Sequence, residues 1–396
     1  MLSSQQQVLP LPEMGSANSG GSSVDSKAAA PRVVDLRSDT VTKPTAQMRA
    51  AMANAEVGND LIGVDPTVCK LQQQMARIFG KEAGLFVPSG TMGNLIGVLV
   101  HCEVRGSEVI LGSECHLHVY EQGGISTLGG VHPRIIPNKA DGTMNLREVE
   151  AAIRPPNDDS YPNTRLICIE NTHNRCGGKC ISVEYTDKVG ELAKWYGLKM
   201  HIDGARIFNA ATALGVSPER LVRAADSISV CLSKGLAAPV GSVLVGSNEF
   251  IAKARKLRRA LGGGMCQAGV IAAAGLVSLQ DMVGRLKDDH RRAQLIAEGL
   301  NAIEGLKVDV ANVDTNIVNV EVTHVSALGA EELCEAMKEQ GVIAMTIGGT
   351  KIRIVTHYHI SDDDVQYAIA CFKDTLLKSS ITQGASVNEM TFKQLT

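Results

Sequence analysis

The chain has 396 residues, with 39 Lys and Arg, 42 Asp and Glu, and 44% apolar residues. This length exceeds what one hydrophobic core usually serves, so we expect two globular domains. A net charge of −3 without basic blocks argues against nucleic-acid binding, and no apolar run approaches membrane-spanning length. The 10 cysteines lie mostly inside apolar runs, which predicts buried, reduced thiols and a cytoplasmic location.

Both ends of the chain predict flexible tails. Residues 1–30 are rich in Ser, Gly, Gln and Ala and lack hydrophobic periodicity, so we expect disorder there. They contain no Arg and two acidic residues, which is not the pattern of a signal or mitochondrial targeting peptide. Residues 379–396 are similarly polar and aperiodic. Cys176 and Cys180 form one isolated C-x3-C pair, which is more often an ordinary loop, so we predict no metal site.

After the first tail, short β-rich runs alternate with helical patterns, which predicts an α/β fold. Asp65 and Pro66 supply a cap and a first-turn proline for a helix that Gly80 ends. Thr186 is the predicted cap of a later helix that Gly197 ends. Continuous apolar runs predict strands covered on both faces, at 85–87, 109–111, 166–169, 199–203, 227–232 and 242–245.

These runs predict three layers around a mostly parallel sheet. A charged amphipathic helix over 281–303, strands at 317–322 and 351–355, and a final helix then predict a smaller α/β domain. We therefore place a large domain at 31–285, including an N-terminal arm, and a small C-terminal domain at 286–378.

Lys234 follows a short apolar strand and enters a turn of small residues. Partial desolvation in such a setting favours the neutral, nucleophilic amine. Upstream, another predicted strand ends at Asp203, followed by Gly, Ala and Arg206. A carboxylate at a strand's end can hold a pyridine nitrogen protonated, and a lysine one crossover later can form a Schiff base with an aldehyde. A lone lysine is usually a surface charge, but together Lys234 and Asp203 predict pyridoxal phosphate (PLP).

Other segments offer partners for a cofactor and an amino-acid substrate. Gly90 and Thr91 follow a strand and open an apolar helix, a setting that binds phosphate. His116 and His118 would share a face if extended, and one imidazole can stack on a cofactor ring and accept a proton. The residues alone do not separate a catalytic from a structural histidine. Arg353 can clamp a carboxylate, although a lone arginine is more often in a surface ion pair.

With these motifs, the chain resembles the low-specificity L-threonine aldolases of the fold type I PLP-dependent superfamily. The matching stretches occur in family order and cover nearly everything between the tails. They are 35–42 (DLRSDTVT), 86–94 (FVPSGTMGN), 169–174 (IENTHN), 201–209 (HIDGARIFN), 231–235 (CLSKG), 262–265 (GGGM) and 353–357 (RIVTH).

The resemblance implies retro-aldol cleavage of L-threonine and L-allo-threonine to glycine and acetaldehyde, a reaction of threonine catabolism and glycine synthesis. It implies Lys234 as the Schiff-base lysine and Asp203 as the pyridinium partner. Arg206 would reach the cofactor's phenolic oxygen and the substrate carboxylate.

The resemblance assigns the remaining site residues too. Gly90 and Thr91 would bind the phosphate, His116 would stack on the ring, and Ser38 and Arg353 would hold the substrate carboxylate. Arg259 would reach the phosphate of a neighbouring subunit. The resemblance therefore implies a homotetramer, a dimer of dimers with shared active sites.

Several positions depart from the family pattern. Ile62 replaces an aromatic residue, and nearby acids are lost at Asn59 and Val64. A family histidine is replaced near residues 160–161, and Cys266 stands where an arginine is usual. We expect these changes to affect the substrate pocket and one phosphate contact, leaving His116, or a water that it orders, as the base.

Two alternatives remain open. The chain could act on another β-hydroxy or β-substituted amino acid, or it could be a PLP-binding dimer with little turnover. Retention of Lys234, Asp203, Arg206 and Arg353 argues against the second alternative.

Overall fold

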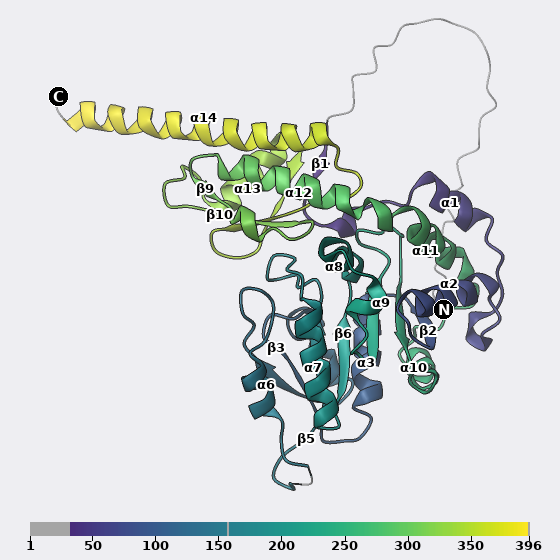
Figure 1. The fold of residues 1–396 in the computed structure, drawn as a ribbon. Coiled ribbons are helices and arrows are strands. Elements are labelled where there is room, and N and C mark those ends of the chain that lie inside the picture. Colours follow the sequence, from purple (N-terminus) through teal and green to yellow (C-terminus); the bar gives the residue numbers. More distant parts are fainter. Residues whose placement is uncertain (1–31, 157, 395–396) are drawn as a thin grey trace, which may run out of the picture. The chain divides into compact units, whose positions relative to one another are not determined.

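The structure is a computed structural model that describes residues 32–156 and 158–394, with side chains as far as Ser379 (Figure 1). The predicted disordered tail at residues 1–30 lies outside the described residues. Two sheets organise the described chain: one of seven strands and one of four, beside a small strand pair.

The larger sheet has the strand order β2-β8-β7-β6-β5-β3-β4. Strand β8 runs antiparallel to both of its neighbours, and every other pair is parallel. The prediction of a mostly parallel sheet is confirmed. The strands are β2 (Ala83–Val87), β3 (Ser107–Gly112), β4 (His132–Ile136), β5 (Asn163–Glu170), β6 (Lys199–Asp203), β7 (Ser227–Cys231) and β8 (Ser242–Gly246).

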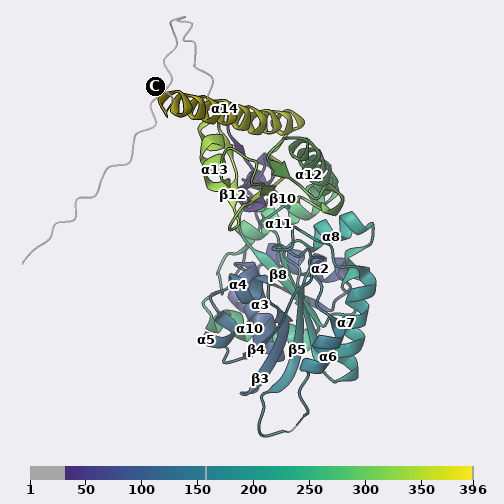
Figure 2. The same ribbon diagram turned by 90° about the vertical axis from the view of Figure 1, so that its left-hand side faces the viewer.

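Helices cover both faces of this sheet, as predicted for three layers. Helices α6 and α7 lie on one side, and α3 and α10 lie on the other (Figure 2). Strands β3, β7 and β8 are buried along their whole length, which explains their unbroken apolar sequences. The helices up to this point in the chain are α1 (Ala46–Ala53), α2 (Pro66–Ile78), α3 (Gly90–His101), α4 (His116–Val119), α5 (Gly124–Thr127), α6 (Leu146–Ala152), α7 (Val183–Trp195), α8 (Ile207–Leu214), α9 (Pro218–Leu221) and α10 (Asn248–Ala260).

The helix starts test the capping predictions. Asp65 caps α2 by accepting a hydrogen bond from the Val68 N–H, as predicted. The prediction that Thr186 caps α7 is wrong. Ser182 accepts the capping bond from Tyr185, while Thr186 lies within the helix and donates its hydroxyl to the Ser182 carbonyl. Threonine inside a helix commonly makes this bond, so its presence does not mark a helix start.

The predicted helix at 281–303 is interrupted. Helix α11 (Gly269–Asp281) ends first, the short 3-10 helix η3 (Val283–Arg285) follows, and α12 (Leu286–Asn301) then begins. By length and composition no single described helix can cross a membrane, although α11 with the adjoining segment Val283–Asn301, bent by 46°, passes that test as a pair. Helices α1, α6, α8, α10 and α11 and strand β4 are among the elements that were not predicted from the sequence.

The four-stranded sheet is antiparallel, in the order β12-β13-β10-β9. Its strands β10 (Ile317–Val322) and β13 (Lys351–Val355) match the two predicted strands, and Asn319 pairs with Arg353. The elements around it are β1 (Val34–Asp35), β9 (Leu306–Lys307), β11 (Val342–Ile343), β12 (Met345–Thr346), α13 (Ala330–Glu339) and α14 (Asp362–Gln394), with 3-10 helices η1 (Asp39–Val41), η2 (Asp60–Ile62) and η4 (Val310–Asn312).

The N-terminal arm packs with the C-terminal part of the chain. Strand β1 pairs in parallel with β11, and Val34 and Leu36 belong to the same hydrophobic core as residues 293–376. The division into domains at residue 285 stays a prediction. At the other end, α14 continues to Gln394, so helical backbone occupies most of the predicted tail at 379–396. All ten cysteines are free.

A buried ion pair anchors the loop before α2. The Nη2 atom of Arg258, on α10, lies 2.8 Å from the Oδ2 atom of Asp60, and both side chains are almost fully buried. Arg258 also donates from Nη1 to the Phe86 carbonyl at 2.7 Å. The Asp60 N–H donates to the Cys266 carbonyl at 2.8 Å. These contacts connect α10, β2 and the segment after α10.

We expect Arg258→Met to reduce the free energy of unfolding by about 3–5 kcal/mol, because Asp60 would keep a buried, unpaired charge. Urea denaturation measures the change. Lys253→Met, on the same helix, is the control, since Lys253 pairs with the exposed Glu103 and Glu249 and little change is expected. Removing both charges with Asp60→Asn and Arg258→Met should recover much of the loss. Unchanged stability in the single variant would contradict this role.

Candidate active site

A cavity of about 330 Å³ lies where several strands of the larger sheet end. Asp203 is the last residue of β6, Lys234 follows β7, and Gly90 is the first residue of α3. Ligands of parallel α/β sheets commonly bind at the carboxyl ends of the strands. The lining residues are Pro88, Ser89, Gly90, Thr91, Asn94, His116, Glu121, Asp203, Ala205, Cys231, Ser233, Lys234, Pro239, Val240 and Gly241.

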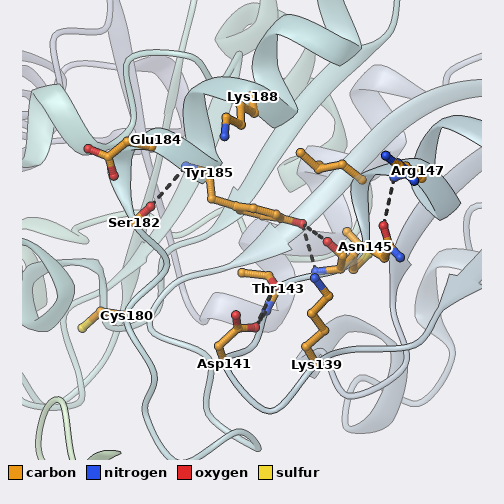
Figure 3. Close-up of a pocket in the computed structure, with 12 residues that line it drawn as sticks. Lys139, Asp141, Thr143, Asn145, Arg147, Cys180, Ser182, Glu184, Tyr185 and Lys188 are labelled. Atoms are coloured by element: carbon orange, nitrogen blue, oxygen red, sulfur yellow. Dashed lines mark hydrogen bonds between the residues drawn. The ribbon is translucent and has the colours of Figure 1, made fainter.

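A larger cavity, of about 550 Å³, lies elsewhere, beside the start of α7. It contains none of the predicted site residues (Figure 3). Tyr185 crosses it and donates its hydroxyl to the Met144 carbonyl at 2.8 Å. Cavity size therefore does not identify the site. The smaller cavity is the candidate because Lys234 and Asp203 line it.

The turns that carry Lys234 and Gly90 approach each other closely. A Cβ atom on Gly90 would lie 2.6 Å from the Cys231 sulfur, so glycine is needed there. Ser89 caps α3, accepting from the Met92 N–H at 3.2 Å. On the other side, the Lys234 carbonyl accepts from the Thr42 hydroxyl at 3.3 Å. The structure thus brings Lys234, Gly90 and Thr91 together at one cavity, as the sequence predicts.

A chain of hydrogen bonds joins His116 to Asp203. The Nδ1 atom of His116 lies 2.7 Å from Glu121 Oε1, and Asn94 Nδ2 donates to Glu121 Oε1 and Asp203 Oδ2, both at 2.9 Å. Asp203 Oδ1 accepts from the Ala205 N–H at 3.0 Å. The two carboxylates are therefore held apart by one neutral amide, and both lie within the cavity wall.

This cluster shifts the proton affinity of its members. Burial lowers the pKa of His116, but the hydrogen bond to Glu121 and the charge of Asp203 outweigh burial, so the net pKa is raised. Burial, reinforced by Asp203, raises the pKa of Glu121 despite its bonds to His116 and Asn94. An ionised carboxylate only accepts hydrogen bonds, so Nδ1 of His116 carries the proton and Nε2 is the acceptor of the neutral ring.

His116, Glu121 and Asp203 each offer a ligand atom, all within 4.8 Å of one another. Such a set can attract a cation, but here Asn94 and the His116 ring already donate hydrogen bonds to these carboxylates. The prediction of no metal stays a prediction.

A second charged cluster surrounds Asp39, which is fully buried. Arg206 donates to both of its oxygens, from Nε at 2.7 Å and from Nη2 at 2.6 Å. Asn316 donates to the same carboxylate at 3.2 Å, and the Nη1 atom of Arg206 donates to Asn174 at 3.2 Å. Burial alone would raise the pKa of Asp39, but Arg206 above all holds it well below its ordinary value. Asp39 is therefore ionised at neutral pH.

Arg353 lies close to this pair without joining it. Burial and then repulsion from Arg206 lower the pKa of Arg353 to about 10. Its buried Nε atom has no hydrogen-bond partner among the described residues. Ser38 directly precedes Asp39 in the chain, and its hydroxyl caps η1 by accepting from the Thr40 N–H at 3.3 Å. Arg353 is thus a guanidinium with capacity for an incoming anion.

Glu170, which no sequence pattern singled out, connects the two clusters. Its Oε2 atom accepts from the His116 N–H at 2.6 Å, and Oε1 accepts from the Asn174 N–H at 2.8 Å. Asn174 in turn holds Arg206. The sequence patterns also did not single out Asp39 or Asn94 as site residues. Asp39, Asn94 and Glu170 all lie in the stretches that match the family, and that match is the sequence feature that could have identified them.

Other predicted residues lie away from the cavity. Helix α4 places His116 in the cavity wall and leaves His118 exposed, so the two do not share a face. Arg259 is exposed in the last turn of α10 and Cys266 is exposed after it. Tyr161 is 51% exposed and packs under Arg154, before β5 and at the opposite end of that strand from Glu170.

Comparisons with known proteins identify the family of this chain. The beta-eliminating lyase family matches residues 35–323. A probable low-specificity L-threonine aldolase 2 of Arabidopsis thaliana is 60% identical over 343 residues, covering 86% of this chain and 97% of the relative. The low specificity L-threonine aldolase of Escherichia coli (strain K12) is 41% identical over 346 residues, covering 87% and 100%. The solved Leishmania major threonine aldolase superposes with a TM-score of 0.73 at 18% identity, covering 87% and 99%, and shows the same fold.

The Glu121 contact can be tested directly. We expect Glu121→Gln to lower the pKa of His116, because the carboxylate that stabilises the protonated ring would be gone. An NMR titration of the histidine ring protons measures it. Glu114→Gln is the matched control, since Glu114 pairs with Arg175 on the surface. A pKa of His116 that is unchanged or raised in Glu121→Gln would overturn the assignment.

Proposed function

This chain belongs to the beta-eliminating lyase family, among the low-specificity L-threonine aldolases, and we propose that it cleaves L-threonine and L-allo-threonine to glycine and acetaldehyde with PLP as cofactor. The observation that carries the proposal is the shared cavity of Lys234 and Asp203, a lysine after one buried strand and a buried carboxylate at the end of the next. This pair matches the two groups that PLP requires of a protein.

The other cavity residues fit PLP as well. Gly90, whose missing side chain opens the wall beside Cys231, and Thr91 would hold the phosphate at the start of α3. Asp203 would accept a hydrogen bond from the pyridine nitrogen and so keep that nitrogen cationic, and His116 would stack on the ring. When bound, PLP acts as the electron sink for the Cα–Cβ bond that breaks.

At the substrate end, Arg353 and Ser38 would hold the carboxylate. The support for Arg353 is its unpartnered, buried Nε atom, which a bidentate carboxylate would satisfy. Fixing the carboxylate orients the Cα–Cβ bond relative to the cofactor, and this orientation selects the bond that breaks. Arg206, held by Asp39 and Asn174, would face the cofactor's phenolic oxygen and share in the carboxylate contact.

The β-hydroxyl proton must leave as the aldehyde forms. His116 presents Nε2 as an acceptor because Nδ1 is bound to Glu121. We therefore assign the proton to Nε2 of His116 or to a water that it orders. General-base help of this kind contributes about 10²–10⁴ in rate.

The same proposal includes a cytoplasmic homotetramer, a dimer of dimers, with Arg259 reaching the phosphate of a neighbouring subunit. Its support is an exposed apolar surface: Ile62 and Val64 are 70% and 58% exposed, and Val270 is 42% exposed. These residues lie on adjoining segments, since Gly269 donates to Asp65. The free cysteines support a reducing compartment.

The direct test measures aldehyde release from L-threonine, L-allo-threonine and phenylserine by the protein loaded with PLP. We expect release from both threonines, and Lys234→Ala should abolish it, because the covalent link to the cofactor would be lost. The visible absorbance that borohydride reduces should disappear in the same variant. Lys188→Ala, at the larger cavity, is the control. A reducible band that persists in Lys234→Ala would contradict the assignment, and release from phenylserine alone would favour another substrate.

Arg353→Lys separates substrate binding from cofactor binding. The variant keeps the positive charge but loses the planar fork, so we expect kcat/KM for L-threonine to fall by about 10²-fold or more. PLP affinity should be unchanged, since the contact is to the substrate. Steady-state kinetics and a PLP titration measure the two effects. Kinetics close to those of the unchanged enzyme would show that the carboxylate is held elsewhere.

A further inference from the structure

Asp39 lies among positively charged groups that the proposed reaction uses. Arg206 contacts it directly, and Lys234 and Arg353 are near enough to stabilise its charge. Asp39 has no exposed surface, so its charge is not solvated by water. A buried carboxylate beside a site that must receive another carboxylate needs an explanation, because the two charges repel each other.

The two arginines differ in their partners. Arg206 is engaged by Asp39 through two hydrogen bonds and by Asn174 through a third. Arg353 has no partner for its buried Nε atom among the described side chains. Asp39 therefore neutralises one cation and leaves the other available.

Resting on the proposed function, we infer that Asp39 is a positioning residue with two effects: it holds Arg206 in place, and it limits the arginine pair to a single net positive charge. The charges of Arg206, Arg353 and Asp39 sum to that of one cation. One cation matches the one carboxylate of a neutral β-hydroxy amino acid. The site would thereby bind its substrate and release glycine without retaining anions too tightly.

The geometry around Asp39 supports a fixed position. Asn316 donates to Asp39 from Nδ2, and the same nitrogen donates to the Thr356 carbonyl at 3.0 Å. Thr356 follows β13, the strand of Arg353. The segment that carries Asp39 also donates from Thr42 to the Lys234 carbonyl. Asp39 is thus tied to Arg206, to the end of the strand that carries Arg353, and to the turn that carries Lys234.

Binding of acetate tests the charge balance without requiring turnover. Acetate carries a carboxylate and no amine, and the line width of its methyl resonance reports its dissociation constant. At fixed ionic strength we expect Asp39→Asn to bind acetate about tenfold more tightly and Arg206→Gln about tenfold more weakly than the unchanged protein. The double variant should lie within about threefold of the unchanged protein, because its net charge is restored. Arg353→Gln should lose acetate binding.

Turnover provides the second measurement. In Asp39→Asn we expect kcat for L-threonine to fall at least about tenfold, and the double variant to be no slower than Arg206→Gln, since Asp39 acts through Arg206. Asp35→Asn is the control, because Asp35 pairs with the exposed Arg37 in the same segment. If Asp39→Asn fails to fold, the double variant can replace it, because it removes both buried charges. Comparing its acetate affinity with that of Arg206→Gln still tests the inference, since the double variant should bind acetate more tightly.

The outcomes separate the two proposals. Two results would overturn the role of Asp39. The first is that Asp39→Asn binds acetate no more tightly than the unchanged protein. The second is that the double variant has a kcat lower than that of Arg206→Gln by the same factor as Asp39→Asn lowers kcat on its own. The expected acetate order without any aldehyde release supports the role and contradicts the proposed reaction.

Discussion

The ion pair between Asp39 and Arg206 joins parts of the chain that are far apart in sequence. A buried pair of this kind is stable only when its geometry is good and its remaining hydrogen-bonding groups are satisfied. Here the pair is bidentate, and Asn316 and Asn174 supply further bonds. The segment that carries Asp39 also accepts from the Val355 N–H through Leu36, at 2.8 Å. One short segment therefore fixes both the Arg206 side chain and the strand that carries Arg353.

The charges of the site are arranged in two groups, and the proposed chemistry needs both. Glu121 and Asp203 form the first group, whose carboxylates suit a protonated pyridine ring, and His116 is hydrogen-bonded to Glu121. Arg206 and Arg353 form the second group, around Asp39, and their positive charge suits the amino-acid carboxylate. Lys234 lies in the cavity wall with Asp203 and within the electrostatic reach of Asp39. Such a field orients a substrate before any bond changes, and preorganised charges of this kind commonly account for much of an enzyme's rate enhancement.

Sequence patterns predicted what depends on local structure. Lys234 and Asp203 could be placed because Asp203 ends one apolar strand and Lys234 follows another, and the ends of parallel strands meet at one edge of the sheet. Asp39 could not be selected in this way, because its partner Arg206 lies 167 residues further along the chain. A buried ion pair leaves no periodic trace in the sequence. The prediction that Thr186 caps α7 was wrong for the opposite reason. The local sequence pattern around a capping threonine is the same as that around a threonine inside a helix.

The departures from the family pattern lie on the surface of this chain. Ile62 and Tyr161 are 70% and 51% exposed, and Cys266 is exposed. Asp60 connects the loop of Ile62 to Cys266 by a backbone hydrogen bond and is itself held by Arg258. Ile62 and Cys266 therefore lie on one connected surface. Neither Ile62 nor Cys266 lines the cavity. A substitution at either position therefore leaves the charged residues of the cavity in place. It can affect the reaction only indirectly, through a residue or group that contacts this surface.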